Sequence, residues 1–245
     1  MTNDEYYNIY RSFVDIINKN RDKFNNFYDV SFLLNPLKDI KVRDGYLLDA
    51  YPVTYIREGA YYFQLYICRE DADTAYHPKL TDIRDSFWKK LNVQKCEKQW
   101  LPKYNDSMYI DTEIPSELEK DIPCDQLVVP FTEKGIWEAL MLKIAYMHLP
   151  KFDHGAYKES RLILCDKDVS ELVIHIAIDN MEWYVGKEKV NRIENGVSIN
   201  GNCAEVKYTY WNDWQGLVKV TTKAYKDGDG IRWDDNSTKE TIYFF

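Results

Sequence analysis

Apolar side chains recur at helical spacing in two parts of the chain. Near the N-terminus, large apolar residues alternate at steps of about four and three: Tyr6, Tyr10, Phe13, Ile17 and Phe24. This period predicts an amphipathic helix over residues 3–26. Thr2 and Glu5 precede the stripe with the spacing of a capping box, in which each residue satisfies a free backbone N–H of the other. We therefore expect a helix that starts close to Thr2 and packs its apolar stripe against the rest of the protein.

The second helical stretch covers residues 132–149 and carries its apolar residues on two adjacent stripes. Thr132 is a suitable N-cap, and Pro150 ends the helix because proline cannot continue the backbone hydrogen bonds. A helix with so broad an apolar surface must be covered on more than one side. We expect this helix at the centre of the fold.

Other segments alternate with the period of a β-strand. Residues 46–56 and 60–68 flank a short turn, which predicts a hairpin. Pro52 lies inside the first of these strands and has no N–H for the strand ladder. That strand should therefore lie at the edge of its sheet or carry a bulge.

Beyond the second helix, short apolar runs are separated by turns rich in Gly, Asn and Asp. The expected strands are residues 161–165, 172–178, 183–185, 190–193, 204–210, 217–225 and 241–245. The turn sequences favour tight hairpins, and they are Asn195-Gly196, Asn200-Gly201, Asn212-Asp213 and residues 227–230. Strands at such regular spacing predict an antiparallel β-meander.

Together these elements predict an α+β fold, in which the C-terminal β-meander packs with a central helix and an N-terminal amphipathic helix. The simplest organisation is a single compact domain over residues 1–245. Periodicity fades in residues 104–125, however, and three prolines lie in or beside this segment. The alternative is therefore an N-terminal half of residues 1–103, an acidic connector of residues 104–125 and a C-terminal half of residues 126–245.

Charge narrows the classes of partner. The chain carries 40 acidic and 32 basic residues, a net charge of −8, and residues 104–125 hold seven acids against one base. A negative field repels phosphate backbones and acidic membranes and attracts basic proteins. We expect another protein as the partner, with a basic surface, and neither nucleic acid nor membrane.

The cysteines and the N-terminus indicate a reducing compartment. Five cysteines are scattered without a C-x-x-C pair, so neither a disulfide framework nor a zinc site is expected. The first residues lack the apolar run of a signal peptide, and the most apolar run, residues 172–178, is far shorter than a membrane span. These features predict a cytoplasmic protein.

A first candidate site lies in the loop after the second helix. Asp153, His154 and Tyr157 place an imidazole next to a carboxylate, a combination that suits general acid–base catalysis. No nucleophile accompanies these residues, and a loop histidine bonded to the backbone explains the same sequence. The acidic turn at residues 227–230 lacks the later ligands of a calcium loop, so we expect neither a metal nor a cofactor.

A second candidate site is the aromatic segment of residues 208–216, which spans a predicted hairpin tip. Its candidate binding residues are Tyr208, Tyr210, Trp211, Asp213 and Trp214. Hairpin tips are normally polar, so two indole rings there either fold back as a lid on the core or meet a partner. Exposed Trp and Tyr dominate binding energies at interfaces.

These features favour a non-enzymatic, cytoplasmic protein-binding module with an acidic, aromatic surface. A toxin-neutralising, immunity-like protein is one example of this class. One alternative is an enzyme or small-molecule binder that uses Asp153, His154 and Tyr157. The other is a carbohydrate or nucleotide binder that stacks its ligand on Trp211 and Trp214.

Overall fold

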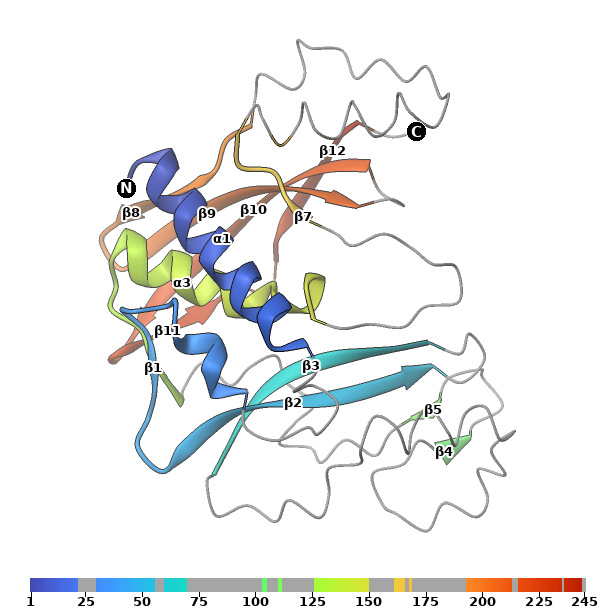
Figure 1. The fold of residues 1–245 in the computed structure, drawn as a ribbon. Coiled ribbons are helices and arrows are strands. Elements are labelled where there is room, and N and C mark those ends of the chain that lie inside the picture. Colours follow the sequence, from blue (N-terminus) through green and yellow to red (C-terminus); the bar gives the residue numbers. More distant parts are fainter. Residues whose placement is uncertain are drawn as a thin grey trace, which may run out of the picture.

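The computed structural model describes two helices packed on an antiparallel sheet (Figure 1). The described residues are 1–21, 30–55, 60–69, 103–104, 110–111, 126–149, 161–165, 168, 193–212, 216–234 and 236–243. The predicted α+β class is confirmed, because helices α1 (Asn3–Lys19) and α3 (Glu133–Lys143) cover one face of the C-terminal sheet. The strands expected at residues 172–178 and 183–185, and residues 190–192 of the strand expected at 190–193, lie outside the described residues.

Helix α1 begins where the sequence predicts. The Thr2 side chain accepts the N–H of Glu5, and the Glu5 carboxylate accepts the N–H of Thr2, so the capping box is complete. The helix ends at Lys19, earlier than the predicted residue 26. Asn20 closes it, because its backbone N–H bonds to the Ile17 carbonyl and its side-chain amide donates to the Ile16 carbonyl at 2.8 Å.

Tyr6 fixes α1 on the elements beneath it. Its ring meets the Trp137 indole edge-on, with centroids 4.6 Å apart, and its backbone carbonyl accepts the indole N–H. Its hydroxyl accepts the N–H of Val197 at 3.1 Å. One aromatic side chain therefore joins α1 to α3 and to strand β8 (Gly196–Asn200).

Helix α3 occupies the centre of the fold, as predicted. Thr132 caps it by accepting the N–H of Gly135 at 3.1 Å. Every residue from 135 to 142 is buried. The helix ends at Lys143, earlier than the predicted residue 149, and a short 3-10 turn, η6 (Ala145–Met147), follows it before Pro150. The buried run includes one carboxylate, that of Glu138.

The C-terminal sheet is the predicted meander, since β8, β9, β10 and β11 pair antiparallel in succession. β7 also pairs with β9, and β12 with β10. The bounds beyond β8 are β7 (Arg161–Leu162), β9 (Cys203–Asn212), β10 (Gly216–Asp227), β11 (Gly230–Trp233) and β12 (Thr238–Tyr243). The turns at Asn200-Gly201 and at residues 227–230 form hairpins as predicted.

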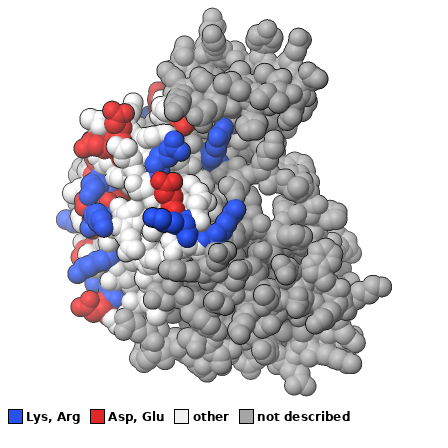
Figure 2. Space-filling view, viewed as in Figure 1, with Lys and Arg blue, Asp and Glu red and all other residues white. Residues whose placement is uncertain are grey.

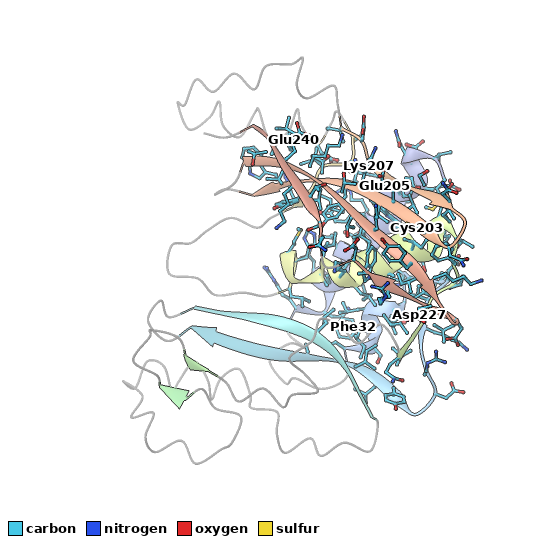
Figure 3. The ribbon with its side chains drawn as sticks, turned by 180° about the vertical axis from the view of Figure 1, so that it is seen from behind. Phe32, Cys203, Glu205, Lys207, Asp227 and Glu240 are labelled. Atoms are coloured by element: carbon cyan, nitrogen blue, oxygen red, sulfur yellow. The ribbon has the colours of Figure 1, made fainter. Side chains whose placement is uncertain are left out.

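The two faces of this sheet differ. The inner face packs on the helices and is lined by apolar residues of β9 and β10: Ala204, Val206, Tyr208, Tyr210, Val218, Val220 and Ala224. On the other face, seven half-exposed or exposed residues alternate with them: Cys203, Glu205, Lys207, Lys219, Thr221, Lys223 and Tyr225. We call these seven residues the open face. Figure 3 views the sheet from this side.

Smaller sheets complete the described structure. β2 (Tyr46–Tyr55) and β3 (Ala60–Arg69) form the predicted hairpin, and among described strands each pairs only with the other, so Pro52 lies in an edge strand. β1 (Lys41–Val42) pairs with β6 (Leu127–Val128), and β4 (Lys103–Tyr104) with β5 (Ile110–Asp111). A 3-10 turn, η2 (Ser31–Leu34), precedes β1. Buried side chains of α1, the β2–β3 hairpin, α3 and the C-terminal sheet form one apolar cluster.

Candidate functional site

The aromatic candidates of strand β9 are buried. Tyr208 and Tyr210 point to the inner face and belong to the apolar core, with ring centroids 6.4 Å apart. Trp211 is 5% exposed and projects to the opposite face, because successive strand residues alternate between faces. Asp213 and Trp214 lie outside the described residues.

Trp211 is a strand residue and not part of the hairpin tip. The predicted strand ends at Tyr210, but β9 continues to Asn212 because it has a neighbour on each side here. Trp211 pairs with Leu217 of β10 and with Arg161 of β7. With only 5% of its surface exposed, Trp211 offers no open ring face for stacking on a sugar or a base.

The side chain of Asn195 extends the ladder between β7 and β9. Its Nδ2 donates to the Ile163 carbonyl and its Oδ1 accepts the N–H of Thr209, both at 2.9 Å. Ile163 in turn donates its N–H to the Thr209 carbonyl at 2.8 Å. The predicted hairpin turn at Asn195-Gly196 is therefore wrong: this amide bridges two strands, and Gly196 opens β8.

Lysines of the open face pair with Glu205 on the same face and with Glu194 beside it. Glu194 lies 2.7 Å from the Lys219 ammonium and 3.6 Å from that of Lys207, which is also 3.3 Å from Glu205. The hydrogen bond from Lys219 lowers the pKa of Glu194, and the bond to Glu205 raises the pKa of Lys207. These groups are solvent-accessible, so each pair contributes little to stability. Their main effect is that Glu194 and Glu205 offset positive charge of Lys207 and Lys219.

The helix-covered side is also mixed in charge. Figure 2 shows acidic and basic side chains interspersed over the described residues there, without a broad patch of one sign. The acidic excess of the whole chain therefore does not come from either described side of the sheet layer. It comes mainly from residues 104–125, which contain seven acids and one base.

The loop candidates Asp153, His154 and Tyr157 lie outside the described residues, whereas both flanks of their loop are described. These flanks meet at the hydroxyl of Tyr10. It accepts the N–H of Leu162 at 3.1 Å, and it lies 3.2 Å from Nε2 of His148. Burial raises the pKa of Tyr10 well above its usual range, so this hydroxyl keeps its proton at all ordinary pH values.

Glu138 is a buried polar residue that sequence reasoning missed. Its Oε2 accepts the N–H groups of Asp39 at 2.7 Å and of Ile40 at 3.3 Å. Its Oε1 lies 3.5 Å from the Lys134 ammonium, which also pairs with the Asp39 carboxylate. This arrangement anchors the loop before β1 on α3. Only the i, i+4 spacing of Lys134 and Glu138 could have drawn attention to it.

The acidic turn between β10 and β11 serves a structural purpose. Arg43 donates two hydrogen bonds to the Asp229 carboxylate, and the Asp229 carbonyl accepts the N–H of Val129. Among the residues the structure describes, no group of three or more His, Cys, Asp or Glu side chains could hold a metal ion. No helix within the described ranges is long and apolar enough to cross a membrane.

Comparison of the chain with protein-family models, with curated proteins and with solved structures found no match.

Proposed function

We propose that this chain is a non-enzymatic protein-binding module, whose acidic segment, residues 104–125, recognises a basic partner protein. The distribution of charge supports this proposal. Seven acids against one base give the segment a net charge of −6, out of −8 for the whole chain. Glu194 and Glu205 pair with lysines beside them, whereas the acidic excess of this segment cannot be neutralised by bases within the segment itself. The segment therefore attracts positive charge from elsewhere.

A basic protein toxin that is neutralised by direct binding is the partner class we favour. An immunity-like protein needs no chemistry of its own, only a stable scaffold and a complementary surface. The buried core described above can provide such a scaffold. Because Tyr208, Tyr210 and Trp211 are buried, we assign recognition to charge and not to these three aromatic rings.

Two triple variants with equal charge change test the proposal. The first replaces three acids of the segment, Glu113, Glu117 and Glu119, with Gln. The matched control replaces three acids on or beside the open face with Gln: Glu205 and Glu240, which Figure 3 labels, and Glu194, which pairs with Lys219. Each variant carries a net charge of −5 in place of −8, because three negative charges are removed.

The immobilised wild-type chain is used to capture partners from native lysate, and captured proteins are then purified for titration calorimetry at low and high salt. We expect a basic partner that binds the segment variant about tenfold more weakly, since three surface charge pairs at roughly 0.5 kcal/mol each sum to about 1.5 kcal/mol. The control variant should stay within about twofold. Equal weakening of both variants, or a captured partner that is not basic, would refute the role of the segment.

A further inference from the structure

Three segments distant in sequence meet at one buried hydroxyl, that of Tyr10 in helix α1. Leu162 of β7 donates its N–H to this oxygen at 3.1 Å. His148, which directly follows η6, places its Nε2 3.2 Å from the same oxygen, and the two rings lie with centroids 5.3 Å apart. Both side chains are buried, and His148 is only 6% exposed.

The geometry assigns the directions of these bonds. The Tyr10 oxygen accepts from Leu162, so its own proton remains to be donated. Within the described part of the chain, Nε2 of His148 is the acceptor in reach of that proton. A ring nitrogen accepts only when it carries no proton, so His148 is neutral here and holds its proton on Nδ1.

We propose that this junction is an acid-sensitive joint, in which protonation of His148 loosens the attachment of α1 and β7 to the end of η6. Free histidine titrates near pH 6.5, so mild acid suffices. A proton on Nε2 would face the Tyr10 hydroxyl. The hydroxyl would then have to turn its proton away from the only acceptor described for it, inside a buried site.

Charged groups of both signs lie around the joint. Arg11 of α1, Arg161 of β7 and Asp168 act electrostatically on the Tyr10 hydroxyl, which gives two bases against one acid. Strand β3 packs on η6, and its side chains described as buried, Leu65 and Ile67, carry no charge. Lys143, in the last turn of α3, lies over the Trp233 ring. The observation that weighs against a charged His148 is its burial, since only 6% of its surface is exposed.

Hydrogen exchange at the Leu162 amide reports the joint directly. Protection factors, corrected for the intrinsic pH dependence of exchange, are measured at pH 7.5 and 5.5 for wild type and for His148→Gln. Gln can still accept the Tyr10 proton but does not titrate. His154→Gln is the matched control, since it removes a histidine from the loop that the joint flanks.

We expect wild-type protection to fall about five- to tenfold on acidification, because free histidine is about ten parts protonated to one part neutral at pH 5.5. His148→Gln should show no fall, and His154→Gln should behave as wild type. An unchanged wild-type protection factor would overturn the proposal. Nitrogen NMR of the labelled wild type gives a second measurement that needs no variant: a proton on Nε2 of His148 at pH 7.5 would also overturn it.

Discussion

Replacement of Glu138 by alanine tests how the centre of the fold is held together. Among the described residues, Glu138 is the one buried acid, with 0% of its surface exposed. Its carboxylate accepts two backbone N–H groups of the loop before β1. Removal of the side chain leaves those two donors, Asp39 N–H and Ile40 N–H, without their partner, and it leaves a cavity against α3.

The expected decrease in the free energy of unfolding follows from these losses. A buried donor without its acceptor costs about 1–3 kcal/mol, and breaking a buried, paired charge typically costs about 3–5 kcal/mol. We expect Glu138→Ala to lower the free energy of unfolding by about 3–5 kcal/mol, a large fraction of the roughly 5–15 kcal/mol typical of a domain. Glu138→Gln keeps an oxygen for both N–H groups, so it should cost only about 1–2 kcal/mol.

Urea denaturation followed by tryptophan fluorescence measures these differences. Glu205→Ala is the control, because it removes a carboxylate that is 44% exposed and pairs with Lys207 at 3.3 Å. Its expected cost is about 0–1 kcal/mol. The reasoning fails if Glu138→Ala is no more destabilising than Glu205→Ala, or if Glu138→Gln costs as much as Glu138→Ala.

Two further predictions concern the backbone and an ion pair. Gly135→Ala should lower the free energy of unfolding, measured by urea denaturation, by about 2 kcal/mol or more, because the new Cβ would lie 2.3 Å from the Pro130 carbonyl oxygen. This clash should outweigh the gain of about 1 kcal/mol that Ala gives over Gly in a helix. A net gain in stability would contradict this prediction. Arg43 lowers the pKa of Asp229, so their pairing stabilises the fold above the ordinary Asp pKa and is lost as the pH falls through the lowered value. In carboxyl NMR titrations, Arg43→Gln should raise the pKa of Asp229 towards the ordinary Asp value, and an unchanged titration would exclude the pairing.

Local signals determined the helix starts and the hairpins. The Thr2–Glu5 capping box and the Thr132 cap join residues that are three positions apart, so their geometry is already implied by spacing. The same holds for the turns that close the C-terminal meander, where Gly201 and Gly228 adopt positive φ. Such contacts form within a few residues of chain, and they do not depend on the rest of the fold.

The candidate site depended on contacts that no local pattern contains. Trp211 was expected near a hairpin tip, but it pairs with Arg161 and Leu217 inside the sheet, and its side chain is buried. Asn195 has the sequence of a turn, yet its amide is held between the Ile163 carbonyl, just beyond β7, which accepts its N–H, and Thr209 of β9, whose N–H it accepts. In each case the partner across the sheet decides the environment of the side chain.

The sequence by itself therefore determined the class of the fold, the apolar face of α1 and the central place of α3. Only the tertiary structure decided where the buried polar groups lie. Glu138 is buried because Asp39, 99 residues away, brings an N–H to it, and Tyr10 meets His148 across 138 residues. A polar side chain can be buried only where a partner satisfies it, and here those partners are brought near by folding and not by spacing.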